Sequence, residues 1–284
     1  MSSSIEGGTN AGLDQIEAPM NYSVDTGEKP VSYTYEPPAG VAPRSGKIVK
    51  QRIVILNGRP IADQLTLDGQ GFMLTHHETA VRDFYDSDEV RAVYYPEVER
   101  LVKQLTGAAR VIVFDHNVRN GSKEMRAKLG VREPVKFAHN DYTLKSGPQR
   151  LRELVGDAEA EELLKHRYAF INVWRPVRGP IEESPLAVCD AQSMTLEDFI
   201  ATDLKYRDRT GEVYSVAYRP AHRWFYFPKM RTNEVLLLKC YDSDERRTRF
   251  TAHSAFEDPT SPPNAAPRES IEARTIAFFA PENS

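Results

Sequence analysis

The second half of the chain is a succession of short, strand-like segments. They span residues 168–174, 186–189, 213–218, 223–227, 234–241, 248–253 and 270–279, and turn residues separate most of them. A run of strands that follows helical segments, instead of alternating with them, indicates an α+β domain. We therefore expect a β-sandwich or jelly-roll core with flanking helices.

The first half carries the helical patterns. Apolar residues follow helical spacing over 87–105, where Ser87 is a candidate cap, Pro96 predicts a kink or two short helices, and Gly107 ends the pattern. A second helix is expected over 148–166. Strands are expected over 47–56 and 110–116, and the charged segment 121–132 is expected to be a loop or lid.

One domain is expected. Residues 1–45 are rich in small polar residues, prolines and glycines, which predicts a partly flexible N-terminal arm. Residues 46–284 contain no stretch typical of a linker, so we expect them to form a single domain.

Charge and cysteine content limit the kinds of binding partner and of cellular compartment that are expected. The net charge of −4 and the pI of about 6.0 do not favour a nucleic-acid or membrane partner. Cys189 and Cys240 are not clustered, so free thiols in a reducing compartment are expected rather than disulfides or structural zinc. No secretory segment is visible, and we expect a cytoplasmic protein that acts on a small molecule. Assembly into a homo-oligomer stays open.

A possible metal site is the most informative motif. His139 and Asp141 are two residues apart on an expected strand over 135–143, so their side chains point the same way. A lone His253 lies far downstream. Two imidazoles and one carboxylate form the facial ligand set that binds ferrous iron and leaves positions open for other ligands.

A second motif opens the last strand. Arg268 and Ser270 form an R-x-S element, and both share a strand face with Glu272 and Arg274. A guanidinium and a hydroxyl side by side are suited to hold a carboxylate. Alone, however, the element also fits a solvated edge strand.

The ordered set H-x-D, distal His and R-x-S resembles the pattern of iron(II)/2-oxoglutarate oxygenases. Longer stretches are similar to a narrower family, which includes a cephem methoxylase subunit, gibberellin desaturase-like enzymes and an aspergillic-acid hydroxylase. These stretches are FDHNVRNG (114–121), AHNDYT (138–143), FINVWRPVRGPIEESPLAVCDAQSM (170–194) and YRPAHRWFYFPKMRTNEVLLLKCYDS (218–243). The resemblance covers roughly residues 50–280.

The resemblance implies a double-stranded β-helix, the cupin-like jelly roll, and an oxygenase that hydroxylates, desaturates or cyclises a small natural-product or amino-acid-like metabolite. It implies iron(II) on His139, Asp141 and His253, with dioxygen and 2-oxoglutarate consumed and succinate and CO2 released. The far carboxylate of 2-oxoglutarate would bind Arg268 and Ser270. The gap between His253 and Arg268 is longer than is usual in the family, so Arg274 remains an alternative anchor.

Further residues are candidates for contact with the substrate. His116 and Arg119 lie in one distinctive motif, whereas Asn172 with Trp174, and Trp224 with Tyr226, each share a strand face. Packing in the core is an equally ordinary role for such residues.

Two other functions use the same residues. A zinc-dependent hydrolase could use the three ligands to activate a bound water. The chain could also be a non-catalytic partner subunit of a two-protein oxygenase, because one family member is named as a component of such an enzyme.

Overall fold

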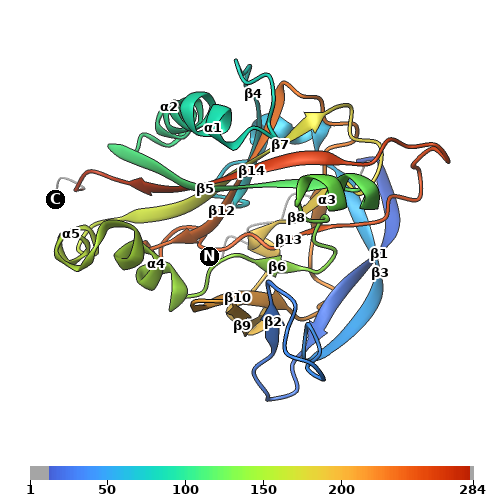
Figure 1. Cartoon of the computed structure of the whole chain (residues 1–284), viewed down its shortest axis with the longest axis horizontal. Coiled ribbons are helices and arrows are strands. Elements are labelled where there is room, and N and C mark those ends of the chain that lie inside the picture. Colours follow the sequence, from blue (N-terminus) through green and yellow to red (C-terminus); the bar gives the residue numbers. More distant parts are fainter. Residues whose placement is uncertain (1–12, 282–284) are drawn as a thin grey trace, which may run out of the picture.

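Two β-sheets face each other, with helices on the outside (Figure 1). The computed structural model describes residues 13–281. Within them, the larger sheet has nine strands in the order β1-β3-β11-β8-β13-β6-β10-β9-β2, and the smaller has five in the order β4-β12-β7-β14-β5. Aromatic and aliphatic side chains such as Phe170, Phe225 and Leu236 fill the space between the sheets. The expected α+β architecture is therefore present.

The smaller sheet carries long central strands. Its strands are β4 (Phe72–His76), β5 (Arg110–Asn120), β7 (Tyr168–Arg178), β12 (Glu234–Asp242) and β14 (Glu269–Phe278). β14 pairs antiparallel with both β5 and β7. As in any strand, its side chains alternate between the two faces of the sheet. One face packs under a helix, and the other faces the larger sheet.

The larger sheet begins at the N-terminal end of the described chain. Its strands are β1 (Gln15–Val24), β2 (Val31–Tyr33), β3 (Lys47–Asn57), β6 (His139–Asn140), β8 (Leu186–Cys189), β9 (Phe199–Lys205), β10 (Thr210–Val216), β11 (Trp224–Tyr226) and β13 (His253–Ala255). β1 pairs with β3 along its whole length, although residues 1–45 were expected to form an arm. Residues 1–12 lie outside the described chain, and the single-domain organisation stays a prediction.

The first helical region, where a kink or two short helices were expected, contains a π-helical turn just before Pro96. It consists of α1 (Ser87–Glu89), a π-helical turn (Val90–Tyr94) and α2 (Tyr95–Thr106). Asp86, not Ser87, caps it, because its carboxylate accepts from the backbone amides of Asp88 and Glu89. Pro96 lies just after the π-helical turn, where the regular i→i−4 hydrogen-bond pattern is already interrupted, and Gly107 ends the helix with a φ of 71°.

The remaining helices differ from the expected ones. The expected loop over 121–132 contains α3 (Lys123–Leu129), which Ser122 caps, and a role as a lid stays a prediction. The expected helix over 148–166 is two helices, α4 (Ser146–Val155) and α5 (Asp157–Leu163), which Gly156 separates at a φ of 82°. None of the helices in the described part of the chain has the length and apolar character needed to cross a membrane.

Candidate metal centre

The three predicted metal ligands lie together between the sheets. His139 of β6 is paired directly opposite His253 of β13, and their ring centroids are 4.3 Å apart. Nε2 of His139 lies 3.6 Å from Oδ1 of Asp141. One ligand atom from each of the three residues lies within 4.8 Å of the other two, which fits a single ion between them.

Asn140, the residue between the two ligands of the H-x-D motif, fixes the local backbone. β6 is only two residues long, so Asp141 lies just past its end instead of within the strand expected over 135–143. Asn140 points the opposite way and is fully buried, and its amide donates to the carbonyl oxygens of Tyr142 and Cys240. These hydrogen bonds hold the backbone so that His139 and Asp141 project to the same side.

Backbone carbonyls orient both imidazoles. Nδ1 of His139 lies 2.8 Å from the carbonyl oxygen of Phe137, and Nδ1 of His253 lies 3.0 Å from that of Thr251. A carbonyl can only accept, so Nδ1 carries the proton and the Nε2 lone pair is left for a metal.

The charge states also suit a metal. Burial and the neighbouring His253 lower the pKa of His139 to about 3, so its imidazole is neutral. Burial favours protonation of Asp141, but Arg274 and the two histidines outweigh it and hold the pKa of this carboxyl below its usual range. Neutral imidazoles and an ionised carboxylate are the forms that bind metal ions.

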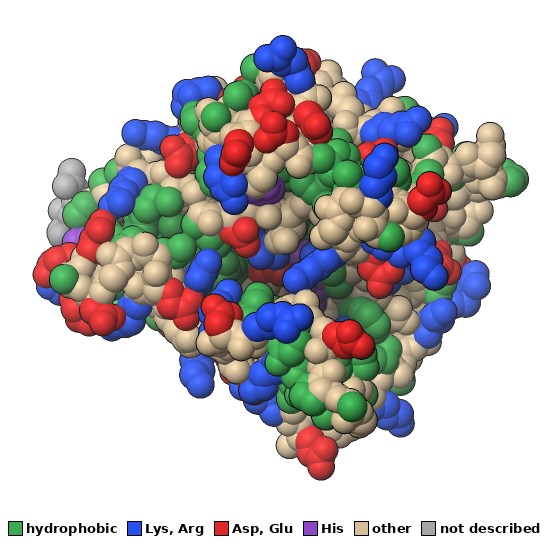
Figure 2. Space-filling model, viewed as in Figure 1, with side chains coloured by type: hydrophobic (Ala, Val, Ile, Leu, Met, Phe, Trp, Pro, Cys, Tyr) green, Lys and Arg blue, Asp and Glu red, His purple; other side chains and the backbone are tan. Residues whose placement is uncertain are grey.

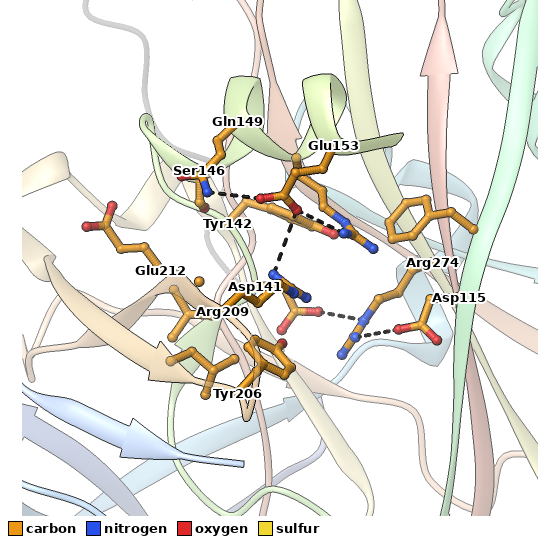
Figure 3. Close-up of a pocket in the computed structure, with 15 residues that line it drawn as sticks. Asp115, Asp141, Tyr142, Ser146, Gln149, Glu153, Tyr206, Arg209, Glu212 and Arg274 are labelled. Atoms are coloured by element: carbon orange, nitrogen blue, oxygen red, sulfur yellow. Dashed lines mark hydrogen bonds and ion pairs between the residues drawn. The ribbon is translucent and has the colours of Figure 1, made fainter. Parts of the chain in front are cut away.

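Side chains of the smaller sheet support Asp141. Nδ2 of Asn172, on β7, donates to Oδ2 of Asp141 at 2.8 Å. Nε of Arg274, on β14, lies 3.5 Å from the same oxygen and 3.4 Å from Oε1 of Glu272. Arg274 also donates to Asp115 at 3.2 Å (Figure 3). The second oxygen, Oδ1, remains directed toward His139.

The other predicted anchor, Arg268, lies just before β14, and its guanidinium forms no ion pair within residues 13–281. Arg268 is 3% exposed, its guanidinium lies over the ring of Trp174, and Nη1 donates to the carbonyl oxygen of Ser184 at 2.6 Å. Nε of Arg268 and Oγ of Ser270 are buried and have no hydrogen-bond partner within residues 13–281. Burial and the nearby Arg119 lower the pKa of Arg268 to about 9. A buried cation beside an unpaired hydroxyl is suited to receive a carboxylate.

The candidate substrate residues fall into two groups. Asn172 and Trp174 face the metal centre, and Arg119 lies opposite Ser270 on the same face of the smaller sheet. His116 is on the other face, where Nδ1 lies 2.9 Å from the hydroxyl of Tyr95. His116 is thus placed to fix α2 on the sheet and does not reach the metal centre.

Trp224 and Tyr226 also lie away from the metal centre. His253 pairs with Val188, which pairs with Phe225, and cross-strand partners project from the same face. Phe225 therefore shares a face with His253, whereas Trp224 and Tyr226 project from the opposite one. There they pack against β1, where Nε1 of Trp224 donates to the Tyr22 hydroxyl at 2.6 Å. The structure corrects the expectation that they line the cavity.

A pocket opens beside Asp141 and Arg274, and sequence reasoning missed most of its walls. It holds about 560 Å³ of empty space open to solvent, and α4 and the turn between β9 and β10 contribute Arg150, Glu153, Tyr206 and Arg209 (Figure 3). Figure 2 shows that this face of the molecule is hollowed near its middle, with basic and acidic side chains at the rim. No motif indicated these residues, because the segments that carry them meet only in the folded chain.

Comparisons with known proteins identify relatives of this chain. Residues 20–278 match a family model described as an oxidoreductase/YMDC permease-like domain. The alpha-ketoglutarate-dependent dioxygenase phiK of a fungal species is 34% identical over 226 residues, covering 75% of this chain and 79% of the relative. The hydroxylase/desaturase efuI of Hormonema carpetanum is 33% identical over 252 residues, covering 81% of this chain and 84% of the relative.

A solved structure extends the likeness to the fold. The iron and alpha-ketoglutarate-dependent endoperoxidase NvfI superposes with a TM-score of 0.83 at 26% identity, covering 94% of this chain and 98% of that chain. This match confirms the expected jelly-roll core with flanking helices. Alpha-ketoglutarate is another name for 2-oxoglutarate, so the cofactors expected from the sequence, iron(II) and 2-oxoglutarate, are also confirmed. The chain belongs to the family of iron(II)/2-oxoglutarate-dependent dioxygenases and hydroxylase/desaturases.

Proposed function

We propose that this chain oxidises a small natural-product or amino-acid-like metabolite by hydroxylation, desaturation or ring formation, with release of succinate and CO2. The observation that carries the proposal is the convergence of His139, Asp141 and His253 next to an open pocket. When bound there, iron(II) with 2-oxoglutarate and dioxygen supplies an oxidant able to remove hydrogen from a C–H bond. Dioxygen and the metabolite are thus the small-molecule partners.

In this proposal the chain holds the iron on one side. Nε2 of each histidine and Oδ1 of Asp141 are the ligand atoms, because hydrogen bonds already occupy Nδ1 of both rings and Oδ2 of the carboxylate. These three residues would hold the iron, and the co-substrate and dioxygen would reach it from the pocket beside Asp141.

The chain also orients 2-oxoglutarate. In this proposal Arg268 and Ser270 receive its far carboxylate, because Nε and Oγ of these residues are buried donors that lack partners among the described residues. Arg274 does not serve as the anchor, because Asp115, Asp141 and Glu272 already surround its guanidinium. Arg119 adds positive charge close to Arg268 and favours an anion there.

The experiment compares oxygen uptake and succinate formation in the wild type and three alanine variants. We expect Asp141→Ala and His253→Ala to abolish iron-dependent succinate formation, and His166→Ala, which alters an exposed histidine, to leave it unchanged. Near-normal decarboxylation of 2-oxoglutarate by Asp141→Ala would refute the assignment.

The same assay separates the two alternatives. A zinc hydrolase would show zinc-dependent hydrolysis without oxygen uptake, whereas a non-catalytic partner subunit would bind iron weakly and stay inactive when isolated. We expect neither result, because the ligand geometry and the unpaired carboxylate anchor occur together in this chain.

A further inference from the structure

Two arginines on opposite walls of the pocket share one carboxylate. Nη1 of Arg150, on α4, donates to Oε2 of Glu153 at 3.0 Å. Nη1 of Arg209, in the turn between β9 and β10, lies 3.8 Å from the same oxygen, as the dashed line in Figure 3 shows. One carboxylate cannot satisfy two guanidinium groups with five N–H donors each. The pair therefore offers donors to a further anion.

The other charged side chains at the pocket wall have polar partners of their own. Oε2 of Glu212 accepts from Nζ of Lys29 at 2.6 Å, and Oε1 accepts from the hydroxyl of Thr143 at 2.5 Å. Asp115 pairs with Arg274, and Asp141 belongs to the metal centre. Among the described residues, Glu153 is the only carboxylate that forms an ion pair with either arginine, so at this point of the wall two cations face one anion.

Aromatic rings hold both guanidinium groups in place. The guanidinium of Arg150 lies over the ring of Phe114 at 5.1 Å, and that of Arg209 lies over the ring of Tyr206 at 4.0 Å. A guanidinium stacked on a ring keeps its N–H groups free at the edge. Phe114, Tyr142 and Tyr206 also give the pocket apolar surface for a hydrocarbon body.

We propose that this pocket selects substrates that carry a carboxylate on an apolar or aromatic body, and that Arg150 and Arg209 bind that carboxylate in competition with Glu153. The inference rests on the proposed function, because it assigns the pocket beside the metal to the substrate. The pocket that the two arginines line also reaches Asp141, so a carboxylate bound by them keeps the body of the substrate in the space beside the metal centre.

The test measures binding of trans-cinnamate and of cinnamamide, its uncharged counterpart, to the full chain loaded with iron(II) and 2-oxoglutarate under anaerobic conditions. Isothermal calorimetry gives both affinities. We expect cinnamate to bind about tenfold to a hundredfold more tightly than cinnamamide, because one or two charge-assisted hydrogen bonds are gained.

Three variants locate the effect. Arg150→Gln and Arg209→Gln should each weaken cinnamate binding about tenfold and leave cinnamamide binding unchanged. Glu153→Gln should strengthen cinnamate binding severalfold, because it removes the competing carboxylate. Arg152→Gln is the matched control, since this arginine of α4 pairs with Glu161 and does not line the pocket.

Three results would overturn the inference: equal binding of the two probes, no measurable heat from millimolar cinnamate, or an equal loss for both probes in the arginine variants. Failure of the proposed function is seen separately, as a wild-type chain that shows no visible charge-transfer band with iron(II) and 2-oxoglutarate. In that case calorimetry still measures whether the pocket binds cinnamate more tightly than cinnamamide.

Discussion

Arg268 and Arg274 are the same kind of residue on the same side of the smaller sheet, yet their surroundings are opposite. Arg274 lies among the carboxylates of Asp115, Asp141 and Glu272, at 3.2 to 3.5 Å. Arg268 is more deeply buried, and its guanidinium has one carbonyl, one aromatic face and no ion pair among the described residues. Arg274 forms an ion pair with the proposed metal ligand Asp141, whereas Arg268 keeps a donor that a ligand could use.

The comparison teaches that counterions, not residue type or strand position, separate a supporting arginine from a ligand-binding one. The compensated cation is needed for the folded state, because its loss leaves buried carboxylates exposed to one another. The uncompensated cation costs the folded state stability until an anion binds. Substitutions of Arg274 and of Arg268 should therefore have different consequences.

The largest effect is expected from Arg274→Leu. Removing the cation from among three carboxylates should lower the free energy of unfolding by about 3–5 kcal/mol and abolish measurable iron binding. Urea unfolding of the metal-free chain and an anaerobic iron titration measure the two effects. Arg52→Leu, at a side chain that is 72% exposed, is the control and should change neither. A stable Arg274→Leu variant with normal iron binding would contradict the supporting role of Arg274.

Arg268→Leu should give the reverse pattern. We expect the dissociation constant for 2-oxoglutarate to rise about a hundredfold, because a two-pronged ion pair is lost. Iron binding should persist. The free energy of unfolding should fall by no more than about 1 kcal/mol, because the lost hydrogen bond to Ser184 and the lost contact with Trp174 are offset by removal of an unpaired buried charge. If 2-oxoglutarate binding is lost in Arg274→Leu but kept in Arg268→Leu, the two roles are exchanged.

Asn172→Ala tests the second side chain that supports Asp141 beside Arg274. This change removes the 2.8 Å hydrogen bond to Oδ2 of Asp141. We expect iron affinity to fall about 10- to 100-fold, as for other residues that orient a metal ligand. In the iron-saturated variant the dissociation constant for 2-oxoglutarate should be unchanged. A variant that binds iron normally but binds 2-oxoglutarate weakly would instead place Asn172 in the co-substrate site.

The smallest effect is expected from Ser270→Ala, which removes a single hydroxyl donor. The dissociation constant for 2-oxoglutarate should rise about threefold to tenfold. The double variant with Arg268→Leu should be less affected than the product of the two single effects, because both donors bind the same carboxylate. Fully multiplicative effects would show that the two residues act independently.

Residues whose chemistry is specified by type and spacing could be predicted from the sequence. Alternation along a strand predicted that His139 and Asp141 share a face, and the ordered motifs that resemble the oxygenases added His253. The structure brings the three side chains together, and their role as iron ligands stays a prediction. The same rule placed Asn172 with Trp174 correctly. It also predicted that Trp224 and Tyr226 share a face, but alternation does not tell which face, and only the pairing of β11 with β8 decides this.

Features that depend on distant contacts could not be predicted. Arg150 and Arg209 meet at Glu153 because α4 packs beside the β9–β10 turn, and no spacing along the chain encodes that contact. β1 was missed because its polar flanking residues resemble a flexible arm, whereas its strength comes from pairing with β3. The lack of a counterion at Arg268 is likewise a property of the folded chain alone.

Anaerobic titration of the wild type and Arg268→Leu with iron(II) and then 2-oxoglutarate tests the central claim most directly. We predict one iron per chain in both proteins. The visible charge-transfer band should appear at low 2-oxoglutarate in the wild type and only at about a hundredfold higher concentration in the variant. A wild-type chain that binds no iron, or a band that forms equally well without the Arg268 guanidinium, would contradict the account.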